Sequence, residues 1–242
     1  MPDPSSEAAT ETATVAVTGA GGSLGQALLR RWHGRGARLI ALSHGSAPLD
    51  LQDRQGRPIP VEQVRWQVGE EAALESLLAR VDVLVLNHGI NVHGDCGADA
   101  TACSLEVNAL SSWRLLELFA AVAERRRGGR RAEVWVNTSE AEIQPALSPL
   151  YEISKRLLGQ LLSLRAPELS RSLRLRRLVL GPFRSALNPI GVMDADWVAG
   201  QILRQADWNC SLIIVTPNPL TYLLMPLATL GRWAYTGLLR RP

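Results

Sequence analysis

A glycine-rich turn between an apolar run and a helical pattern constrains the fold of this chain more than any other feature. Residues 14–17 are apolar or β-branched, Thr18-Gly-Ala-Gly-Gly-Ser-Leu-Gly25 follows them directly, and residues 26–32 have a helical pattern. Glycines in such a turn let the backbone approach a pyrophosphate closely, whose charge then lies at the positive end of the helix. An ordinary glycine-rich turn is the simpler alternative. The order of the three segments predicts the first strand and helix of a parallel α/β sheet.

Short apolar runs alternate with longer amphipathic stretches along the rest of the chain, which is the pattern of βαβ units. With 242 residues, 46% of them hydrophobic, the chain can bury a large core as one domain. We predict a single Rossmann-type doubly wound domain, with a seven-stranded parallel sheet flanked by helices, over residues 14–216. The expected strands are 14–18, 38–42, 64–68, 83–87, 133–137, 175–180 and 212–215, and the expected helices are about 24–35, 70–80, 99–124, 150–165 and 194–206.

A tyrosine and a lysine four residues apart, Tyr151 and Lys155, lie in a segment with a helical pattern. This spacing places both side chains on one face of a helix. A nearby ammonium group favours the phenolate, so we expect the pKa of Tyr151 to fall below its usual value of about 10. Such a pair also occurs by chance on surface helices. Together with the glycine-rich turn, it indicates a proton donor for carbonyl reduction or alcohol oxidation.

The order of the motifs resembles the short-chain dehydrogenase/reductase family from about residue 14 to residue 216. The matching segments are the glycine-rich turn, with Ser23 in place of its middle glycine, then Leu86-Asn87-His88-Gly89, Asn108, Val134–Ser139 and Leu180–Ser185. More narrowly, segments 87–94, 137–142 and 181–193 are similar to the reductase half of bacterial proteins that fuse a sterol-desaturase-like membrane domain to such a reductase. We expect no such membrane domain within these 242 residues.

The resemblance implies roles for four catalytic residues. Tyr151 would donate its proton to a carbonyl oxygen, Lys155 would hold the ribose of the nicotinamide, and Asn108 would anchor a water. The catalytic serine is open between Ser139, Thr138 and Glu140. We favour Ser139, because a hydroxyl can donate a hydrogen bond to the carbonyl, whereas an ionised carboxylate can only accept one.

The resemblance also implies a dinucleotide site at the carboxyl ends of the strands. The carboxylate that would bond the ribose of NAD is missing after the second strand, where Ser43 and His44 follow Leu42. We therefore favour NADP over NAD, although the arginine expected for the extra phosphate is missing from this segment too. The predicted cofactor-binding residues are Thr18, Gly19, Gly21, Gly22, Ser23, Leu24, Gly25, Ser43, His44, Asn87, Gly89, Tyr151, Lys155, Gly181 and Ser185.

The two ends of the chain differ in character. Residues 1–13 are mostly polar and are expected to be a disordered tail rather than a signal peptide. Residues 217–242 form an apolar segment interrupted by Pro226, Gly231 and Arg232. Two interpretations stay open for it. One is a tail packed on the domain or on a second copy, and the other is an interfacial segment that makes peripheral membrane contact through residues 220–241.

The remaining features favour a cytoplasmic enzyme with a small-molecule partner. The net charge is only +3, the three cysteines form no paired framework, and the four histidines have no metal-ligand spacing. Because of this histidine spacing, no metal is expected. The basic run 125–131 lacks the aromatic or motif context of a nucleic-acid site, so nucleic acid is not expected either. The family resemblance implies a homo-oligomer.

Two functions from different classes follow from the sequence. The first is an NAD(P)-dependent oxidoreductase that interconverts a ketone and an alcohol on a hydrophobic, lipid- or sterol-like substrate. The alternative is a catalytically weak dinucleotide sensor, or a partner protein of a membrane-bound oxygenase. Retention of Tyr151, Lys155 and Asn108 favours the enzyme. The substituted positions and the unassigned catalytic serine favour the alternative: Ser23, Leu86, Leu180 and Ser139.

Overall fold

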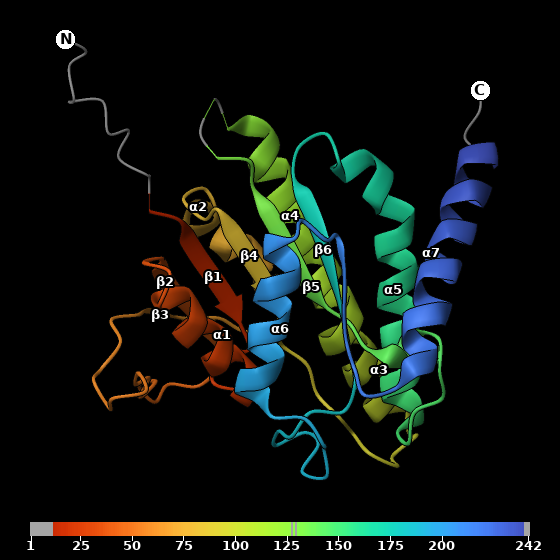
Figure 1. Ribbon diagram of the computed structural model, residues 1–242, viewed down its shortest axis with the longest axis horizontal. Helices are drawn as coiled ribbons and strands as arrows, with labels where there is room; N and C mark the ends of the chain where they lie inside the picture. Colours follow the sequence, from red (N-terminus) through yellow and green to blue (C-terminus); the bar gives the residue numbers. More distant parts are fainter. Residues whose placement is uncertain (1–11, 127, 129, 240–242) are drawn as a thin grey trace.

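The computed structural model describes residues 12–126, 128 and 130–239, with the side chains of 236–239 left aside (Figure 1). Most of the predicted N-terminal tail, residues 1–11, lies outside the described residues.

Seven parallel strands form one sheet, in the order β3-β2-β1-β4-β5-β6-β7 (Figure 1). The predicted doubly wound α/β fold is therefore confirmed. The apolar strands β1 and β4 are buried along their whole length at the centre of the sheet, because helices cover both faces. The strands are β1 (Thr14–Thr18), β2 (Arg38–Ser43), β3 (Glu62–Arg65), β4 (Val83–Leu86), β5 (Glu133–Asn137), β6 (Arg174–Leu180) and β7 (Leu212–Val215).

The helices divide between the two faces. On one face, α1 (Ser23–His33) and α6 (Ala195–Asp207) pack together over a core that includes Trp32 and Trp135. The other face carries α2 (Glu75–Leu78), α4 (Ser111–Arg125) and α5 (Pro149–Leu169), over a core centred on Phe119. The short helix α3 (Ala98–Leu105) lies against α5 near its beginning.

The strand order reverses between β1 and β4. From β1 the chain builds outward through β2 and β3, and from β4 it builds the other way through β5, β6 and β7. In sheets of this kind ligands bind beyond the carboxyl ends of the strands at such a point. The predicted site residues can therefore be sought at this edge.

Three predicted elements differ from the structure. The third strand is Glu62–Arg65 rather than 64–68, because it is an edge strand paired only with β2 and the chain turns away after Trp66. The predicted helix 99–124 is interrupted by a π-helical turn, η2 (Glu106–Leu110), between α3 and α4. The predicted helix 70–80 is a 3-10 turn, η1 (Glu71–Leu74), followed by α2.

The apolar C-terminal segment forms the helix α7 (Pro219–Leu239), which runs along α5 (Figure 1). Thr221 and Met225 are buried where α7 meets the domain, whereas many of its other apolar side chains are exposed. Across the described residues, no helix combines the length and apolar character needed to cross a bilayer.

Candidate functional site

The glycine-rich turn presents backbone rather than side chains at the switch point of the sheet. Gly19 has a φ of +61°, and a Cβ there would lie 2.9 Å from the His88 Cα. A Cβ on Gly25 would overlap the Gly19 carbonyl oxygen, whereas a Cβ on Gly21 would meet no described atom within 4 Å. Among the described residues, no side chain caps the first turn of α1. The turn therefore offers uncapped helix N–H groups and open space, which fits a dinucleotide pyrophosphate.

A hydrogen-bonded network fastens this turn to the end of β4. The Thr18 hydroxyl accepts from the backbone N–H of Asn87 (2.9 Å) and shares a hydrogen bond with His88 Nδ1 (2.8 Å). The Asn87 amide donates to the Gly19 carbonyl (3.4 Å) and accepts from the Asn137 side chain (2.8 Å). Thr18 and Asn87 thus hold the turn in place, and the predicted contact of Thr18, Asn87 and Gly89 with the cofactor stays a prediction.

His88 also belongs to this network, although no catalytic or binding role was predicted for it from the sequence. Its Nε2 lies 3.1 Å from the Ser111 hydroxyl, and its ring packs edge-on against Trp66 at 5.0 Å between centroids. Burial, together with the charge of Lys155, lowers the pKa of His88 to about 3. The imidazole is therefore neutral near neutral pH and acts as a fixed hydrogen-bonding link.

At the end of β2, Ser43 lies opposite Arg65 of β3. Paired residues of neighbouring strands point to the same face of a sheet, so the guanidinium group accompanies the Ser43 hydroxyl at the carboxyl edge. His44 follows, exposed, in the loop. Residues 43–46, at the end of β2, contain no arginine, as expected. Strand register brings Arg65 there from a different segment, and an exposed arginine suits a phosphate.

Tyr151 and Lys155 come together with Ser139 at the end of β5. The helix α5 places the Lys155 Nζ 5.6 Å from the centre of the Tyr151 ring. The Nζ donates to the Asn137 carbonyl (3.1 Å), and the Ser139 side chain lies near enough to Tyr151 to lower the pKa of its phenol. A hydroxyl, a phenol and an ammonium group thus meet at the carboxyl edge of the sheet.

The protonation tendencies of this group differ from the prediction. Burial raises the pKa of Tyr151 above its usual value, the Ser139 hydrogen bond opposes this, and the charge of Glu140 raises it further. Burial lowers the pKa of Lys155 to about 8. The expected lowering of the Tyr151 pKa by Lys155 is therefore wrong for the protein alone, because desolvation disfavours both charged forms.

The three candidates for the catalytic serine have different neighbours. The Thr138 hydroxyl is buried and donates to the Leu178 carbonyl (3.1 Å). Glu140 accepts from the hydroxyls of Thr216 (2.6 Å) and Thr221 (3.2 Å). The Ser139 Oγ accepts from the Ala141 N–H (3.2 Å), and of the three side chains it is the one whose hydrogen bonding lowers the pKa of Tyr151. Its catalytic role stays a prediction, and this contact favours it.

Asn108 lies in the π-helical turn and is fully buried. Its Oδ1 accepts from the Ile90 N–H (2.8 Å), and its Nδ2 donates to the Ile90 carbonyl (3.1 Å) and to the Ser154 hydroxyl (3.1 Å). The amide therefore fixes the loop after β4 against α5. The contacts of its side chain support a positioning role. Its predicted role of anchoring a water stays a prediction.

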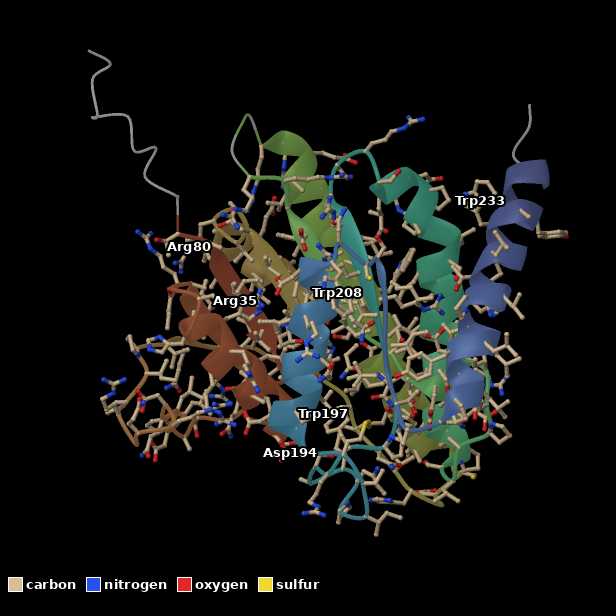
Figure 2. All side chains as sticks on the ribbon, in the orientation of Figure 1. Arg35, Arg80, Asp194, Trp197, Trp208 and Trp233 are labelled. Atoms are coloured by element: carbon tan, nitrogen blue, oxygen red, sulfur yellow. The ribbon has the colours of Figure 1, made fainter. Side chains whose placement is uncertain are left out.

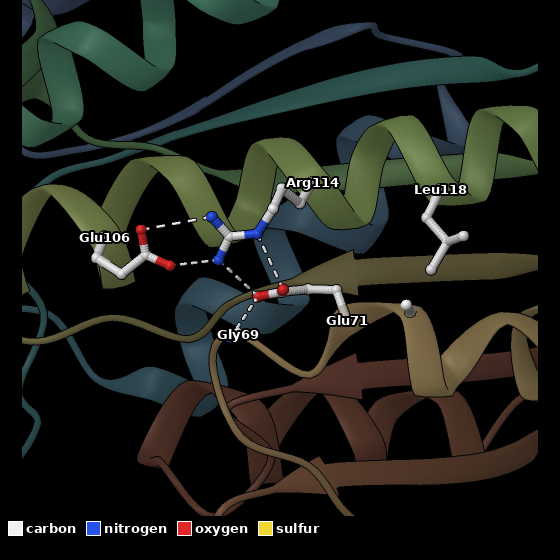
Figure 3. A pocket seen from close by; sticks show the side chains of 6 residues that line it. Gly69, Glu71, Glu106, Arg114 and Leu118 are labelled. Carbon is white, nitrogen blue, oxygen red and sulfur yellow. Dashed lines mark hydrogen bonds and ion pairs between the residues drawn. The ribbon is translucent and has the colours of Figure 1, made fainter.

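The hollow beside the π-helical turn is filled by ion pairs (Figure 3). Arg114 bridges Glu71 (2.9 Å) and Glu106, and Glu71 also accepts from the Gly69 N–H (3.0 Å). Burial alone would raise the pKa of Glu71, but Arg114 and the Gly69 N–H lower it to about 2. The hollow has a volume of about 450 Å³, and its charged side chains are already paired with one another. We therefore interpret these ion pairs as a brace for η2 rather than as a binding site.

The loop after β6 approaches the glycine-rich turn. The Ser23 hydroxyl donates to the Arg184 carbonyl (3.2 Å). A Cβ on Gly181 would overlap Thr216, so this position needs glycine. Ser185 accepts from the Asn188 N–H (3.1 Å) within its own turn. The side chain of Leu24 is buried in the core, so only its backbone is available to a cofactor.

Comparisons with known proteins agree with this geometry. Residues 15–145 match the NAD dependent epimerase/dehydratase family. The chain is 45% identical over 212 residues, 88% of its length, to the monoglucosyldiacylglycerol epimerase of Synechocystis sp., and the match spans about half (51%) of that relative. The relative is named as an epimerase rather than a desaturase fusion, so the narrower resemblance to fusion proteins is unconfirmed.

Solved structures share the fold. A short-chain dehydrogenase from Sphingobium yanoikuyae in complex with NADPH has a TM-score of 0.75 at 22% identity, covering 95% of this chain and 96% of that one. The bulky-bulky ketone specific alcohol dehydrogenase from Comamonas testosteroni also has a TM-score of 0.75, at 19% identity, with 96% of both chains covered.

Proposed function

The chain belongs to the NAD dependent epimerase/dehydratase family of dinucleotide-dependent enzymes, and from this premise we propose that it inverts a hydroxyl-bearing carbon on the sugar of a glycosylated diacylglycerol. Inversion proceeds through oxidation of the alcohol to a ketone and reduction of the ketone from its other face. The proton and the hydride that leave the carbinol are both returned, so the reaction consumes no cofactor overall.

The meeting of Tyr151, Ser139 and Lys155 at the end of β5 carries this proposal. When bound, a nicotinamide dinucleotide supplies the acceptance and return of hydride. Tyr151 takes the hydroxyl proton as the ketone forms and returns it as the alcohol is restored. Ser139 hydrogen-bonds the same oxygen. The cationic form of Lys155 favours the phenolate and holds ribose hydroxyls.

A rim of exposed apolar side chains supports a lipid substrate. Leu147, in the loop between β5 and α5, is 95% exposed. Ile190 and Val192, in the loop after β6, are 78% and 68% exposed. Both loops follow strands and therefore lie at the carboxyl edge of the sheet, as Tyr151 does. Apolar surface around a polar site suits a molecule with a sugar head and acyl chains.

The cofactor site supports NADP over NAD as the preferred dinucleotide. The glycine-rich turn suits the pyrophosphate of either one. At the end of β2, the Ser43 hydroxyl, the His44 ring and the Arg65 guanidinium can all bind a 2′-phosphate, and no carboxylate of the described residues follows β2 directly to repel it.

The test is a sugar analysis of the lipid product. Purified protein is incubated with monoglucosyldiacylglycerol in mixed micelles, with either NADP or NAD at substoichiometric concentration. We expect the sugar to change configuration over many turnovers of each cofactor molecule, and Tyr151→Phe to abolish the change. Oxidised lipid in a one-to-one ratio with reduced cofactor would indicate a dehydrogenase instead. Cofactor binding without any turnover would favour the sensor or partner role.

A further inference from the structure

A groove of about 560 Å³ lies between the ends of α5 and α7, on the side of the molecule away from Tyr151. It opens near the beginnings of β6 and β7, whereas the candidate site lies beyond their carboxyl ends. Apolar side chains form much of its wall, among them Leu162, Ala166, Leu175 and Leu212. The groove is therefore separate from the site of the proposed reaction.

The charge in this groove is of one sign. Its described lining includes Arg131, Arg174, Arg177 and Arg232 but no aspartate or glutamate. Two of these arginines converge, because Arg177 and Arg232 both donate to the Ser163 hydroxyl at 3.2 Å.

This positive charge is only partly balanced. Within the described part of the chain, the one carboxylate paired with either of the two converging guanidinium groups is that of Glu142, which pairs with Arg177. Burial and the neighbouring Arg232 lower the pKa of Arg177 to about 9. Arg131 and Arg174 add charge nearby, although Arg174 also pairs with Glu133 (3.6 Å). An anion between the guanidinium groups would relieve their repulsion.

The outer face of α7 continues the groove as an apolar ridge. Leu223, Leu227 and Leu230 are more than half exposed, and Trp233 is 70% exposed although it lines the groove. Figure 2 shows Trp233 near the C-terminal end of α7. Arg232 is the only charged residue in Pro219–Leu239. Tryptophan beside arginine at the end of an apolar helix suits the boundary between headgroups and acyl chains.

We propose that this groove binds the phosphate of an anionic phospholipid within a bilayer, while the apolar ridge of α7 enters the headgroup region. The arginines account for the phosphate, and the ridge beside them accounts for a lipid rather than a soluble anion. Membrane attachment through this surface is independent of the sugar chemistry, so it stands or falls separately from the proposed function.

The experiment is co-sedimentation of the full chain with vesicles at fixed ionic strength. One set is pure dioleoylphosphatidylcholine and the other contains 30 mol% dioleoylphosphatidylglycerol, as a chosen composition. We expect preferential binding to the anionic vesicles, and Arg232→Gln should weaken it roughly fivefold. The double variant Leu227→Gln/Leu230→Gln should bind neither set. Arg54→Gln, an exposed arginine in the loop before β3, is the matched control and should bind as wild type.

Several outcomes would overturn the proposal. Equal binding of Arg232→Gln and wild type to anionic vesicles would remove the groove from the interaction. Equal binding to both vesicle sets would leave no role for the arginines. Full competition by millimolar inorganic phosphate would make the groove a site for small soluble anions. A dimer in light scattering that dissociates in the leucine variant would assign the ridge to a second copy. Melting curves of each variant verify that it is folded.

Discussion

The cofactor half and the substrate half of the candidate site are built by different means. Around β1 and α1, the site is backbone, with glycines packed so closely that Gly25 touches the turn it helps to form. Around α5, the site consists of buried polar side chains, Lys155 above all. A backbone site depends on local sequence, whereas a side-chain site depends on neighbours from distant segments. The first can therefore be found from a motif, whereas the burial and the distant neighbours of the second are seen only in the assembled protein.

The largest expected effect separates chemistry from binding in the substrate half. We expect Tyr151→Phe to lower turnover by about 10² to 10⁴-fold, because it removes the group that carries the proton. Affinity for NADPH, measured by nucleotide fluorescence, should stay nearly unchanged, because the cofactor half is untouched. Tyr222→Phe is the matched control, since the Tyr222 hydroxyl bonds the backbone of Thr216, donating to its carbonyl (3.3 Å) and accepting from its N–H (3.5 Å). Full activity in Tyr151→Phe would end the enzymatic interpretation.

The buried Lys155 should make the substrate half sensitive to pH. Because its pKa is lowered to about 8 in the folded protein, the unfolded chain binds more protons between pH 8 and its usual pKa. The buried charge of Lys155 therefore lowers the free energy of unfolding by its full amount below pH 8. This destabilisation fades as the pH rises from about 8 to the usual pKa of lysine. Lys155→Met should therefore stabilise the cofactor-free protein at pH 7 by roughly 3 kcal/mol.

Urea unfolding at pH 7 and at pH 10 measures this effect. The gain in stability from Lys155→Met should shrink at the higher pH, where the wild-type lysine is neutral in the folded protein. Lys155 is the only lysine of the chain, so no other lysine contributes to the difference. A gain of equal size at both values would show that packing, rather than desolvation of the charge, sets the cost.

At the end of β2, the cofactor half depends on side chains rather than on backbone. Arg65→Gln should weaken NADPH binding by about 10 to 100-fold, the loss of a charge-assisted hydrogen bond to phosphate, with NADH binding nearly unchanged. Arg54→Gln serves as the exposed control. If both cofactors lost affinity equally, Arg65 would act on the shared part of the dinucleotide and the preference for NADP would lose its support.

The smallest expected effect compares two glycines of one turn. Gly25→Ala should cost about 1–3 kcal/mol in the free energy of unfolding, because its Cβ would overlap the Gly19 carbonyl. Gly21→Ala, whose Cβ meets no described atom, should leave stability within about 0.5 kcal/mol. Chemical denaturation measures both. Equal losses would mean that the turn depends on glycine flexibility rather than on close packing.

The sequence predicted the fold well because the inner strands are continuous apolar runs. The bounds of β1, β5 and β7 agree with prediction. The error at β3 has a physical cause. An edge strand is paired on one side only, so the apolar alternation through Trp66 and Val68 did not mark where pairing ends. The π-helical turn η2 was not predicted for another reason, because one added residue hardly disturbs the helical periodicity of the sequence.

The candidate site was only partly predictable. The glycine-rich turn and the pair of Tyr151 and Lys155 are local patterns. Arg65 was missed because only strand register brings it beside Ser43. The raised pKa of Tyr151 was missed because spacing describes proximity to Lys155 but not the burial of both groups. No local pattern could show that His88 links Thr18 to Ser111.

The π-helical turn has a consequence for how α3 and α4 tolerate change. Each residue of an α-helix advances by about 100°, so one surplus residue rotates everything after it relative to everything before it. In this chain the surplus lets Asn108 hold Ile90 while Phe119 still faces the sheet. Deleting a single residue within 106–110 would restore an uninterrupted helix and disrupt one of these two contacts. Point substitutions on either side keep the rotation, so the length of this segment is constrained more tightly than its composition.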